Sequence, residues 1–234
     1  MTPRERLVVA LDVPDAARAE TLVDALAGSV GMFKVGSQLF TAAGPGFVRS
    51  LAERGLPVFL DLKFHDIPNT VSQAVAAAGA LGVSLLTIHG LGGREMLEAA
   101  VAARPTGTRL LAITVLTSHT PESLARIGIA AALPDEVKRL ALLAREAGVD
   151  GVVASPHEVE AIRTTCGRDF LVVTPGIRPA GTRAGDQARA ATPASALLAG
   201  ADYLVVGRPI TEAGDPQGAA RAIVAEMETA AARL

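Results

Sequence analysis

Asp61 and Lys63 lie two positions apart in residues 58–71, which read VFLDLKFHDIPNTV. Because side chains alternate between the two faces of a β-strand, both would point to the same side, with Cα atoms about 6.6 Å apart. Charges are costly to bury unless each has a partner. An acid and an ammonium on an apolar strand therefore indicate either a structural ion pair or a working site.

Two further charged residues could join this pair. Lys34 lies on the preceding apolar run, and Asp66 follows in the next loop. Two neighbouring lysines favour loss of each other's proton unless carboxylates lie between them. An alternating array of Lys34, Asp61, Lys63 and Asp66 would keep both ammonium groups charged and hold a proton donor in place. Its titration would belong to the set rather than to one residue.

Two later segments have the composition of an anion site. Gly207 and Arg208 directly follow the run YLVV and could offer a backbone N–H and a guanidinium to a phosphate; the alternative is a turn glycine beside a solvated arginine. Residues 176–191 (GIRPAGTRAGDQARAA) form a segment longer than most loops. This favours a lid that closes over an anionic group, with a surface excursion as the alternative.

Strand-like and helix-like segments alternate along the chain. Short runs rich in β-branched residues occur at 7–11, 32–35, 58–62, 84–88, 110–115, 151–153, 170–174 and 203–206. Segments with helical periodicity include 15–26, 46–54, 71–81, 94–103, 133–147, 156–165, 193–199 and 216–232. This alternation predicts an α/β fold, a (β/α)8 TIM barrel formed by a single domain over residues 1–234, with a doubly wound open sheet as runner-up.

Barrels of this kind place their active sites at the carboxyl ends of the strands. In this sequence, polar or special residues recur at those ends: Asp12, Lys34, Asp61, Lys63, His89, Thr117, Ser118, Pro175, Gly176, Gly207 and Arg208. Two of them have plausible alternatives. Asp12 could be a helix cap, and a histidine on a buried strand, such as His89, is more typical of a core residue than of a base.

Composition argues against several classes of protein. The net charge is −2 and no basic block is present, so nucleic-acid binding is not expected. The single Cys166 fits a reducing compartment, and neither a signal peptide nor a membrane span is apparent, so we expect a cytoplasmic protein. The histidines have no metal-ligand spacing, and neither an ATP nor a dinucleotide motif opens a helix.

The combined motifs closely resemble those of the orotidine 5′-phosphate decarboxylase family. They are LDV, FKVG, DLKFHDIPNTV, VLTS, TPGIRP, GDQ and VVGRPI, and they follow the family's order and spacing over nearly the whole chain. The resemblance implies cofactor-independent decarboxylation of orotidine 5′-monophosphate to UMP in pyrimidine biosynthesis, with no metal.

The resemblance also implies a role for each site residue. Lys63 would donate the proton to C6 of the pyrimidine, Asp61 would lie beside the departing carboxylate, and Lys34 would help to hold the ribose. Asp66 and Thr70 would reach into the partner subunit's site in a homodimer. The other implied substrate contacts are Asp12 to the ribose, Thr117 and Pro175 to the pyrimidine, and Arg178, Gln187, Gly207 and Arg208 around the phosphate.

Two other functions compete with this one. A related sugar-phosphate decarboxylase or aldolase on the same barrel would require a divalent metal, and an acidic cluster dedicated to a metal is not evident in the sequence. A barrel that only binds nucleotides, or that serves as an assembly subunit, would tolerate loss of Lys63.

Overall fold

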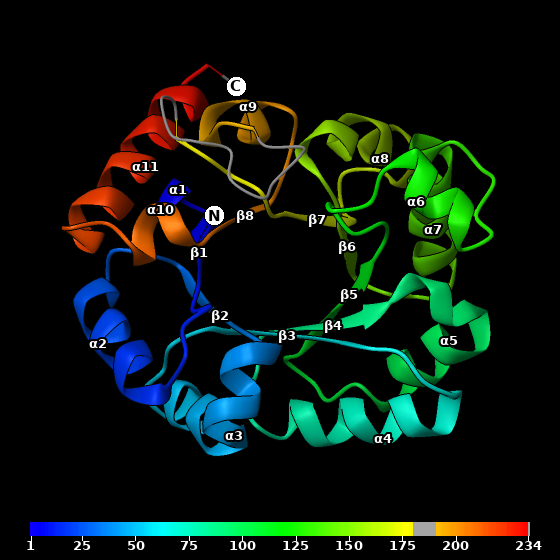
Figure 1. Ribbon diagram of the computed structural model, residues 1–234, viewed down its shortest axis with the longest axis horizontal. Coiled ribbons are helices and arrows are strands. Elements are labelled where there is room, and N and C mark those ends of the chain that lie inside the picture. The colour runs from blue at the N-terminus through cyan, green and yellow to red at the C-terminus, as the bar shows by residue number, and fades with distance from the viewer. Residues whose placement is uncertain (180–190, 234) are drawn as a thin grey trace.

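The computed structural model describes residues 1–179 and 191–233. Within these residues, eight parallel strands close into a barrel in the order β1-β2-β3-β4-β5-β6-β7-β8, and helices surround it (Figure 1). β1 pairs with both β2 and β8, which closes the sheet. The predicted (β/α)8 barrel is therefore confirmed, and the open sheet is excluded.

The strands are β1 (Leu7–Ala10), β2 (Met32–Gly36), β3 (Val58–Phe64), β4 (Leu85–His89), β5 (Arg109–Ile113), β6 (Gly151–Val153), β7 (Leu171–Thr174) and β8 (Tyr203–Val206). The α-helices are α1 (Pro3–Arg6), α2 (Ala16–Leu26), α3 (Ser37–Glu53), α4 (Pro68–Gly79), α5 (Gly93–Ala103), α6 (Pro121–Arg126), α7 (Leu133–Glu146), α8 (Val159–Cys166), α9 (Pro193–Leu198), α10 (Arg208–Thr211) and α11 (Pro216–Ala231). Two 3-10 turns, η1 (Gly90–Gly92) and η2 (Pro156–Glu158), precede α5 and α8.

Every predicted strand overlaps an observed one, whereas the helix bounds differ more. Helix α3 begins at Ser37, well before the predicted start at residue 46. The reason is a kink, because Gly44 has φ 72° and Pro45 follows it, so two helical segments meet there. The sequence pattern detected only the second segment. The short helices α1, α6 and α10 were not predicted, and capping boxes begin α1 and α6.

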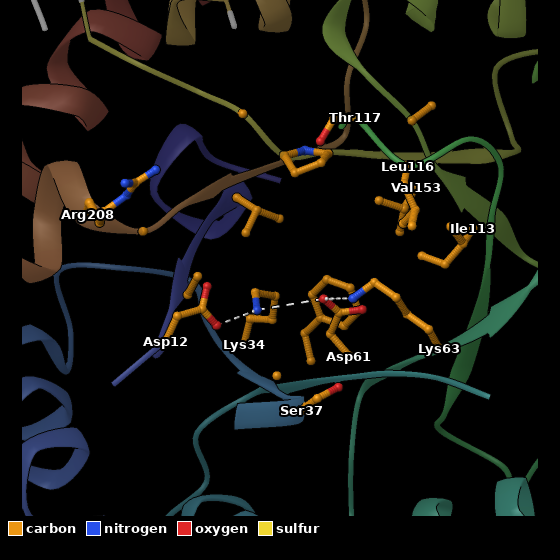
Figure 2. A pocket seen from close by; sticks show the side chains of 18 of the residues that line it. Asp12, Lys34, Ser37, Asp61, Lys63, Ile113, Leu116, Thr117, Val153 and Arg208 are labelled. Atoms are coloured by element: carbon orange, nitrogen blue, oxygen red, sulfur yellow. Dashed lines mark hydrogen bonds and ion pairs between the residues drawn. The ribbon is translucent and has the colours of Figure 1, made fainter. Parts of the chain in front are cut away.

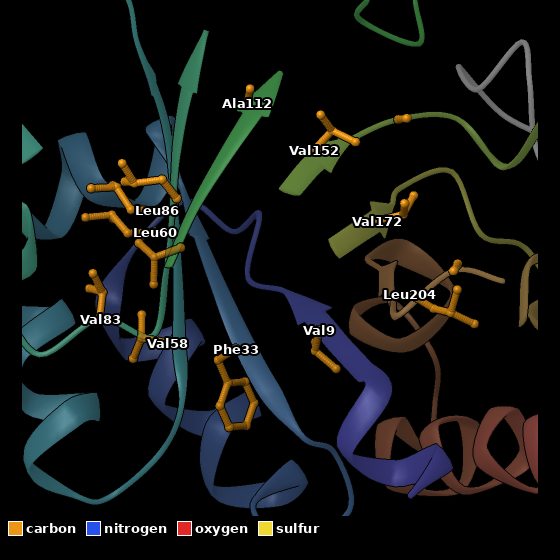
Figure 3. Close-up of a cluster of buried hydrophobic side chains, with 14 of the residues drawn as sticks. Val9, Phe33, Val58, Leu60, Val83, Leu86, Ala112, Val152, Val172 and Leu204 are labelled. Atoms are coloured by element: carbon orange, nitrogen blue, oxygen red, sulfur yellow. The ribbon is translucent and has the colours of Figure 1, made fainter. Parts of the chain in front are cut away.

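The strands bury both of their faces, as parallel strands covered by helices must. Val9, Leu60 and Leu204 belong to the outer layer, which packs against the helices (Figure 3). Val8 and Phe59, which alternate with them, belong to a smaller cluster inside the barrel. Each strand therefore separates two apolar layers, and polar side chains that enter the barrel do so near the strand ends.

A polar clamp holds the amino-terminal side of β7 and β8. Asp202 accepts hydrogen bonds from the Val172 amide at 2.7 Å and from Arg163 Nη2 at 2.5 Å. Arg163 also donates to the carbonyl oxygens of Phe170 and Gly200. The Arg163 and Asp202 side chains are only 15% and 18% exposed. The pair joins three segments at the end of the barrel opposite the strand carboxyl ends.

Removing Asp202 should therefore destabilise the fold. We expect Asp202→Ala to lower the free energy of unfolding by about 3 kcal/mol, because it leaves the Arg163 charge buried without its partner. The measurement is urea unfolding followed by circular dichroism. Asp24→Ala, which breaks the exposed pair of Asp24 and Arg54, is the control and should cost less than about 1 kcal/mol. Equal losses in the two variants would contradict a structural role for the clamp.

Candidate active site

The carboxyl ends of the strands open into a cavity of about 540 Å³. Its lining comes from the ends of most of the barrel strands and from the loops that follow them. Four charged side chains lie in a row along one wall, in the order Asp12, Lys34, Asp61 and Lys63 (Figure 2). The predicted gathering of polar residues at this end of the barrel is thus observed.

The charges in this row alternate in sign. Lys34 Nζ lies 2.9 Å from Asp12 Oδ1 and 3.6 Å from Asp61 Oδ2. Lys63 Nζ lies 2.9 Å from the same Asp61 oxygen. Lys34 and Asp61 are nearly buried, with side chains 10% and 13% exposed, whereas Lys63 is 36% and Asp12 56% exposed. The buried Lys34 and Asp61 therefore form ion pairs with the more exposed Asp12 and Lys63.

Within this one chain, the carboxylate at the far end of the row is Asp12, whereas Asp66, the predicted fourth member of the array, does not line the cavity. Strand β3 ends at Phe64, and residues 65–70 are all exposed. Asp66 Oδ1 accepts a hydrogen bond from the next backbone amide, Ile67, at 2.6 Å. Asp66 and Thr70 are thus outside the cavity of their own chain. The helix-cap alternative for Asp12 is also excluded, because Asp15 caps α2.

The backbone at Lys63 departs from a regular strand. Lys63 has φ 55°, and among the described residues it is the one non-glycine residue with positive φ. The pairing of β3 with β4 shifts register between Leu60 and Phe64. Alternation along a regular strand therefore does not explain how Lys63 reaches Asp61. A left-handed residue in a bulge turns the ammonium back toward the cavity, and such backbone strain is typical of functional sites.

Thr87 on β4 holds this irregular segment, and it was not among the residues predicted for the site. Its Oγ1 accepts a hydrogen bond from the Lys63 amide at 2.9 Å and donates one to Asp61 Oδ1 at 3.0 Å. Thr87 is completely buried. The available signal was a single hydroxyl in the otherwise apolar run LLTI, next to the strand that carries the charged pair.

Basic side chains lie at the other end of the row. Arg208 begins α10 at the Asp12 end of the cavity (Figure 2), and Gly207 and Arg178 also line the cavity. Burial lowers the pKa of Arg178 below its ordinary value, and the nearby positive charge of Arg208 lowers it further. Two guanidinium groups that influence each other in this way are suited to a ligand with more than one negative charge.

Apolar side chains line the Lys63 end of the cavity. Ile113, Leu116 and Val153 lie close together on the same side of the cavity as Lys63 (Figure 2). Thr117 and Pro175 also line the cavity, as predicted from their strand ends. The apolar group was not among the predicted site residues, because strand-end aliphatic residues look like core in a sequence. An apolar wall lowers the local dielectric constant, which strengthens the electrostatic effect of a nearby charge such as that of Lys63.

Part of the predicted site lies outside the described residues. Gln187 and residues 180–190 of the predicted lid belong to this group. Among the described residues, no cluster of three or more His, Cys, Asp or Glu side chains is arranged to hold a metal ion. Within the same part of the chain, no helix is both long and apolar enough to cross a membrane.

His89, which ends β4, stacks on His65 beside this site. Their ring centroids are 5.0 Å apart with an interplanar angle of 17°. His89 Nδ1 accepts a hydrogen bond from the Leu91 amide, so this nitrogen carries no proton. Burial lowers the pKa of His89 to about 4, and the charges of His65, Lys63 and His119 contribute. His89 is therefore a neutral, hydrogen-bonded residue at pH 7, and it is half-buried rather than part of the core.

Comparison with known proteins identifies the family of this chain. The family model described as "Orotidine 5'-phosphate decarboxylase / HUMPS family" matches residues 5–223. The chain belongs to this family. Two relatives named "Orotidine 5'-phosphate decarboxylase" are similar to it: the Moorella thermoacetica protein is 56% identical over 97% of this chain and 94% of the relative, and the Anaeromyxobacter sp. protein is 54% identical over 97% and 100%.

A solved structure supports the same relationship. The crystal structure of orotidine 5′-phosphate decarboxylase from Lactobacillus acidophilus superposes with a TM-score of 0.84 at 39% identity, and covers 94% of this chain and 98% of that one. The barrel and its charged row therefore belong to a chain that matches members of the decarboxylase family over nearly its whole length.

The lowered pKa of His89 predicts a pH-dependent stability. Between pH 6.5 and about 4, the unfolded state binds more protons at this residue than the folded state. Stability should therefore fall as pH decreases through this window. In His89→Asn, the amide oxygen can still accept a hydrogen bond from Leu91. We expect the free energy of unfolding of this variant to fall by about 1–3 kcal/mol less than that of the wild type between pH 7 and 4.5.

The measurement is urea unfolding at a series of pH values, read by circular dichroism. The same substitution at the exposed His157 is the control and should leave the pH profile of the wild type in place. Identical profiles for His89→Asn and the wild type would contradict this account of His89.

Proposed function

We propose that this protein decarboxylates orotidine 5′-monophosphate to UMP, in the de novo synthesis of pyrimidines. The observation that carries the proposal is the order of groups across the cavity. Arg208 lies at one end, Asp12 and Lys34 follow, and Lys63 lies at the other end (Figure 2). This order matches the phosphate, ribose and pyrimidine of one nucleotide. The family membership and the names of the relatives support the same substrate.

Lys63 is the proposed proton donor. When the bond between C6 and the carboxylate breaks, CO₂ leaves and the electron pair stays on C6. An ammonium placed beside that carbon stabilises the developing charge and then donates a proton to form the C6–H bond. Lys63 Nζ is suited to this step because it is partly exposed to the cavity while Asp61 fixes it from behind at 2.9 Å. The neutral lysine then regains a proton from solvent.

Asp61 and Lys34 are proposed to position this donor. Asp61 Oδ2 contacts both ammonium groups, so a single oxygen sets the distance between them. In the proposed complex Asp61 also lies beside the substrate carboxylate. It would act there either by repelling the carboxylate or by positioning Lys63 alone.

The other end of the cavity is proposed to bind the rest of the nucleotide. Asp12 and Lys34 would bind the ribose, and Thr117 and Pro175 would contact the pyrimidine. Around the phosphate we propose Arg178, Gln187, Gly207 and Arg208. Because the phosphate is remote from C6, its binding energy would contribute to the rate by closing and desolvating the site.

We propose that the active form is a homodimer in the cytoplasm. Asp66 and Thr70 lie on the exposed segment 65–70 and do not line the cavity of their own chain, so their proposed roles need a second copy that receives them. Ile67 between them is 66% exposed, so a second copy that packs on this segment would also cover a large apolar side chain. The buried free thiol of Cys166 is in keeping with a reducing compartment.

The reaction and the role of Lys63 are tested together by the loss of ultraviolet absorbance of orotidine 5′-monophosphate. We expect wild-type turnover with excess EDTA, because the proposed chemistry uses no metal. Lys63→Ala should reduce turnover by at least about 10⁴-fold, since it removes both the charge and the proton.

Two controls accompany this assay. Lys138→Ala removes an exposed lysine on α7 and should keep wild-type turnover. Lys63→Ala should still bind UMP through the phosphate end of the cavity. Turnover that EDTA abolishes and magnesium restores would instead favour the metal-dependent sugar-phosphate enzyme, and near-normal turnover of Lys63→Ala would exclude the proposed proton donor.

The shared site is tested by mixing two inactive variants, Asp66→Asn and Lys63→Ala. A hybrid dimer would contain one site with Lys63 from one subunit and Asp66 from the other, both intact. At equal concentrations, with random exchange, half of the dimers would be hybrids with one working site, so about a quarter of wild-type activity should return. Subunit exchange would be verified by mass spectrometry of differently tagged subunits. Demonstrated exchange without any return of activity would disprove the shared site.

A further inference from the structure

Thr87 has two hydrogen-bond partners, and both belong to the proposed catalytic pair. Its hydroxyl donates to the Asp61 carboxylate at 3.0 Å and accepts from the Lys63 amide at 2.9 Å. The side chain is 0% exposed, and it lies behind the charged row rather than on the cavity wall. Thr87 therefore cannot touch a ligand directly, but it contacts both residues that would.

The bond to Asp61 fixes the rotation of its carboxylate. Thr87 binds Oδ1, which leaves Oδ2 facing Lys63 at 2.9 Å and Lys34 at 3.6 Å. Rotation of the carboxylate about χ2 is a soft motion, because this torsion joins sp³ and sp² carbons. A donor on one oxygen is needed to keep the other oxygen between the two ammonium groups.

The bond to Lys63 fixes the backbone. Where β3 shifts register against β4, between Leu60 and Phe64, Lys63 adopts φ 55°. A left-handed conformation costs a non-glycine residue about 1–2 kcal/mol. A hydrogen bond from its amide to Thr87 offsets part of this cost and holds the residue in place. One hydroxyl thus couples the direction of the lysine side chain to the orientation of the carboxylate.

We propose that Thr87 is a positioning residue for the decarboxylation, which it serves by holding the Asp61 carboxylate and the Lys63 backbone in the geometry that presents the Lys63 ammonium to C6. This inference rests on the proposed function. The hydroxyl of Thr87, rather than the volume of its side chain, would set the geometry of Asp61 and Lys63.

Three variants separate the hydroxyl from the volume. Thr87→Val keeps the β-branched shape and removes the donor and acceptor. Thr87→Ser keeps the hydroxyl and removes a methyl group. Thr108→Val is the matched control, because Thr108 is also buried and its hydroxyl donates to the Val83 carbonyl at 2.9 Å, at the opposite end of the barrel.

We expect Thr87→Val to lower kcat by about 10²-fold, because misplacement of a charged group in the transition state costs far more than a change in binding. Its KM, and its affinity for UMP, should change by less than about 3-fold, because the phosphate end is intact. Thr87→Ser should retain at least about a third of wild-type kcat. Thr108→Val should lose stability as Thr87→Val does, yet keep wild-type kcat.

A crystal structure of Thr87→Val gives a second readout that does not depend on activity. We expect the Asp61 carboxylate to rotate and the distance between Lys63 Nζ and Asp61 Oδ2 to exceed the present 2.9 Å by more than about 1 Å. If Thr87→Val does not fold, Thr87→Cys, whose thiol is a weak donor, replaces it in both measurements.

Several outcomes would overturn the proposal: wild-type kcat in folded Thr87→Val, equal losses of kcat in Thr87→Val and Thr108→Val, or an unchanged charged pair in the variant's crystal structure. Failure of the proposed function looks different. In that case the wild type itself shows no turnover of orotidine 5′-monophosphate, and the crystal structure alone decides whether Thr87 holds the pair.

Discussion

The Asp61 carboxylate is 13% exposed, and three donors from three different strands surround it. Lys34 comes from β2, Lys63 from β3 itself and Thr87 from β4. A buried carboxylate with too few partners would be costly, and two ammonium groups without an anion between them would repel each other. The constraint is therefore mutual. Each of these groups can remain at the floor of the cavity only because the others are there, and any geometry offered to a substrate depends on their shared arrangement.

The barrel supplies this arrangement through its strand order. Strands β8, β1, β2 and β3 are consecutive neighbours, and Arg208, Asp12, Lys34 and Asp61 come from these strands or the loops directly after them. The order of these residues across the cavity is therefore the same as the order of the strands in the barrel. Closure of the barrel between β8 and β1 is essential to it, because Arg208 lies far from Asp12 in the sequence. The proposed nucleotide would therefore extend across the ends of four adjacent strands.

The sequence predicted the parts of this site that follow from periodicity. It did not predict the features that depend on which residues of neighbouring strands lie next to each other. Alternating strands and helices predicted the barrel, and the rule that sites follow strand ends predicted Asp12, Lys34, Asp61 and Lys63 together. The place of Asp66 in the array stays a prediction, because β3 continues to Phe64 and Asp66 follows in an exposed segment outside the cavity of its own chain. Neither the left-handed Lys63 nor its bond to Thr87 is encoded in local pattern, since a bulge depends on pairing with the next strand. Gln187, the lid and the homodimer stay predictions.

The two ends of the cavity differ in a way that separates binding from chemistry. At the end with Arg178 and Arg208, burial lowers the pKa of Arg178 and the charge of Arg208 lowers it further, so an anion bound between the two guanidinium groups would reduce their repulsion. At the other end, each charge of the row already has an opposite partner within 3.6 Å. Binding of a substrate in its ground state therefore adds less favourable electrostatic energy there than at the arginine end. Favourable interaction there must arise mainly when new negative charge develops beside Lys63. On the proposed function, Arg178 and Arg208 therefore contribute affinity through the phosphate, whereas the compensated row acts on the charge that develops in the transition state.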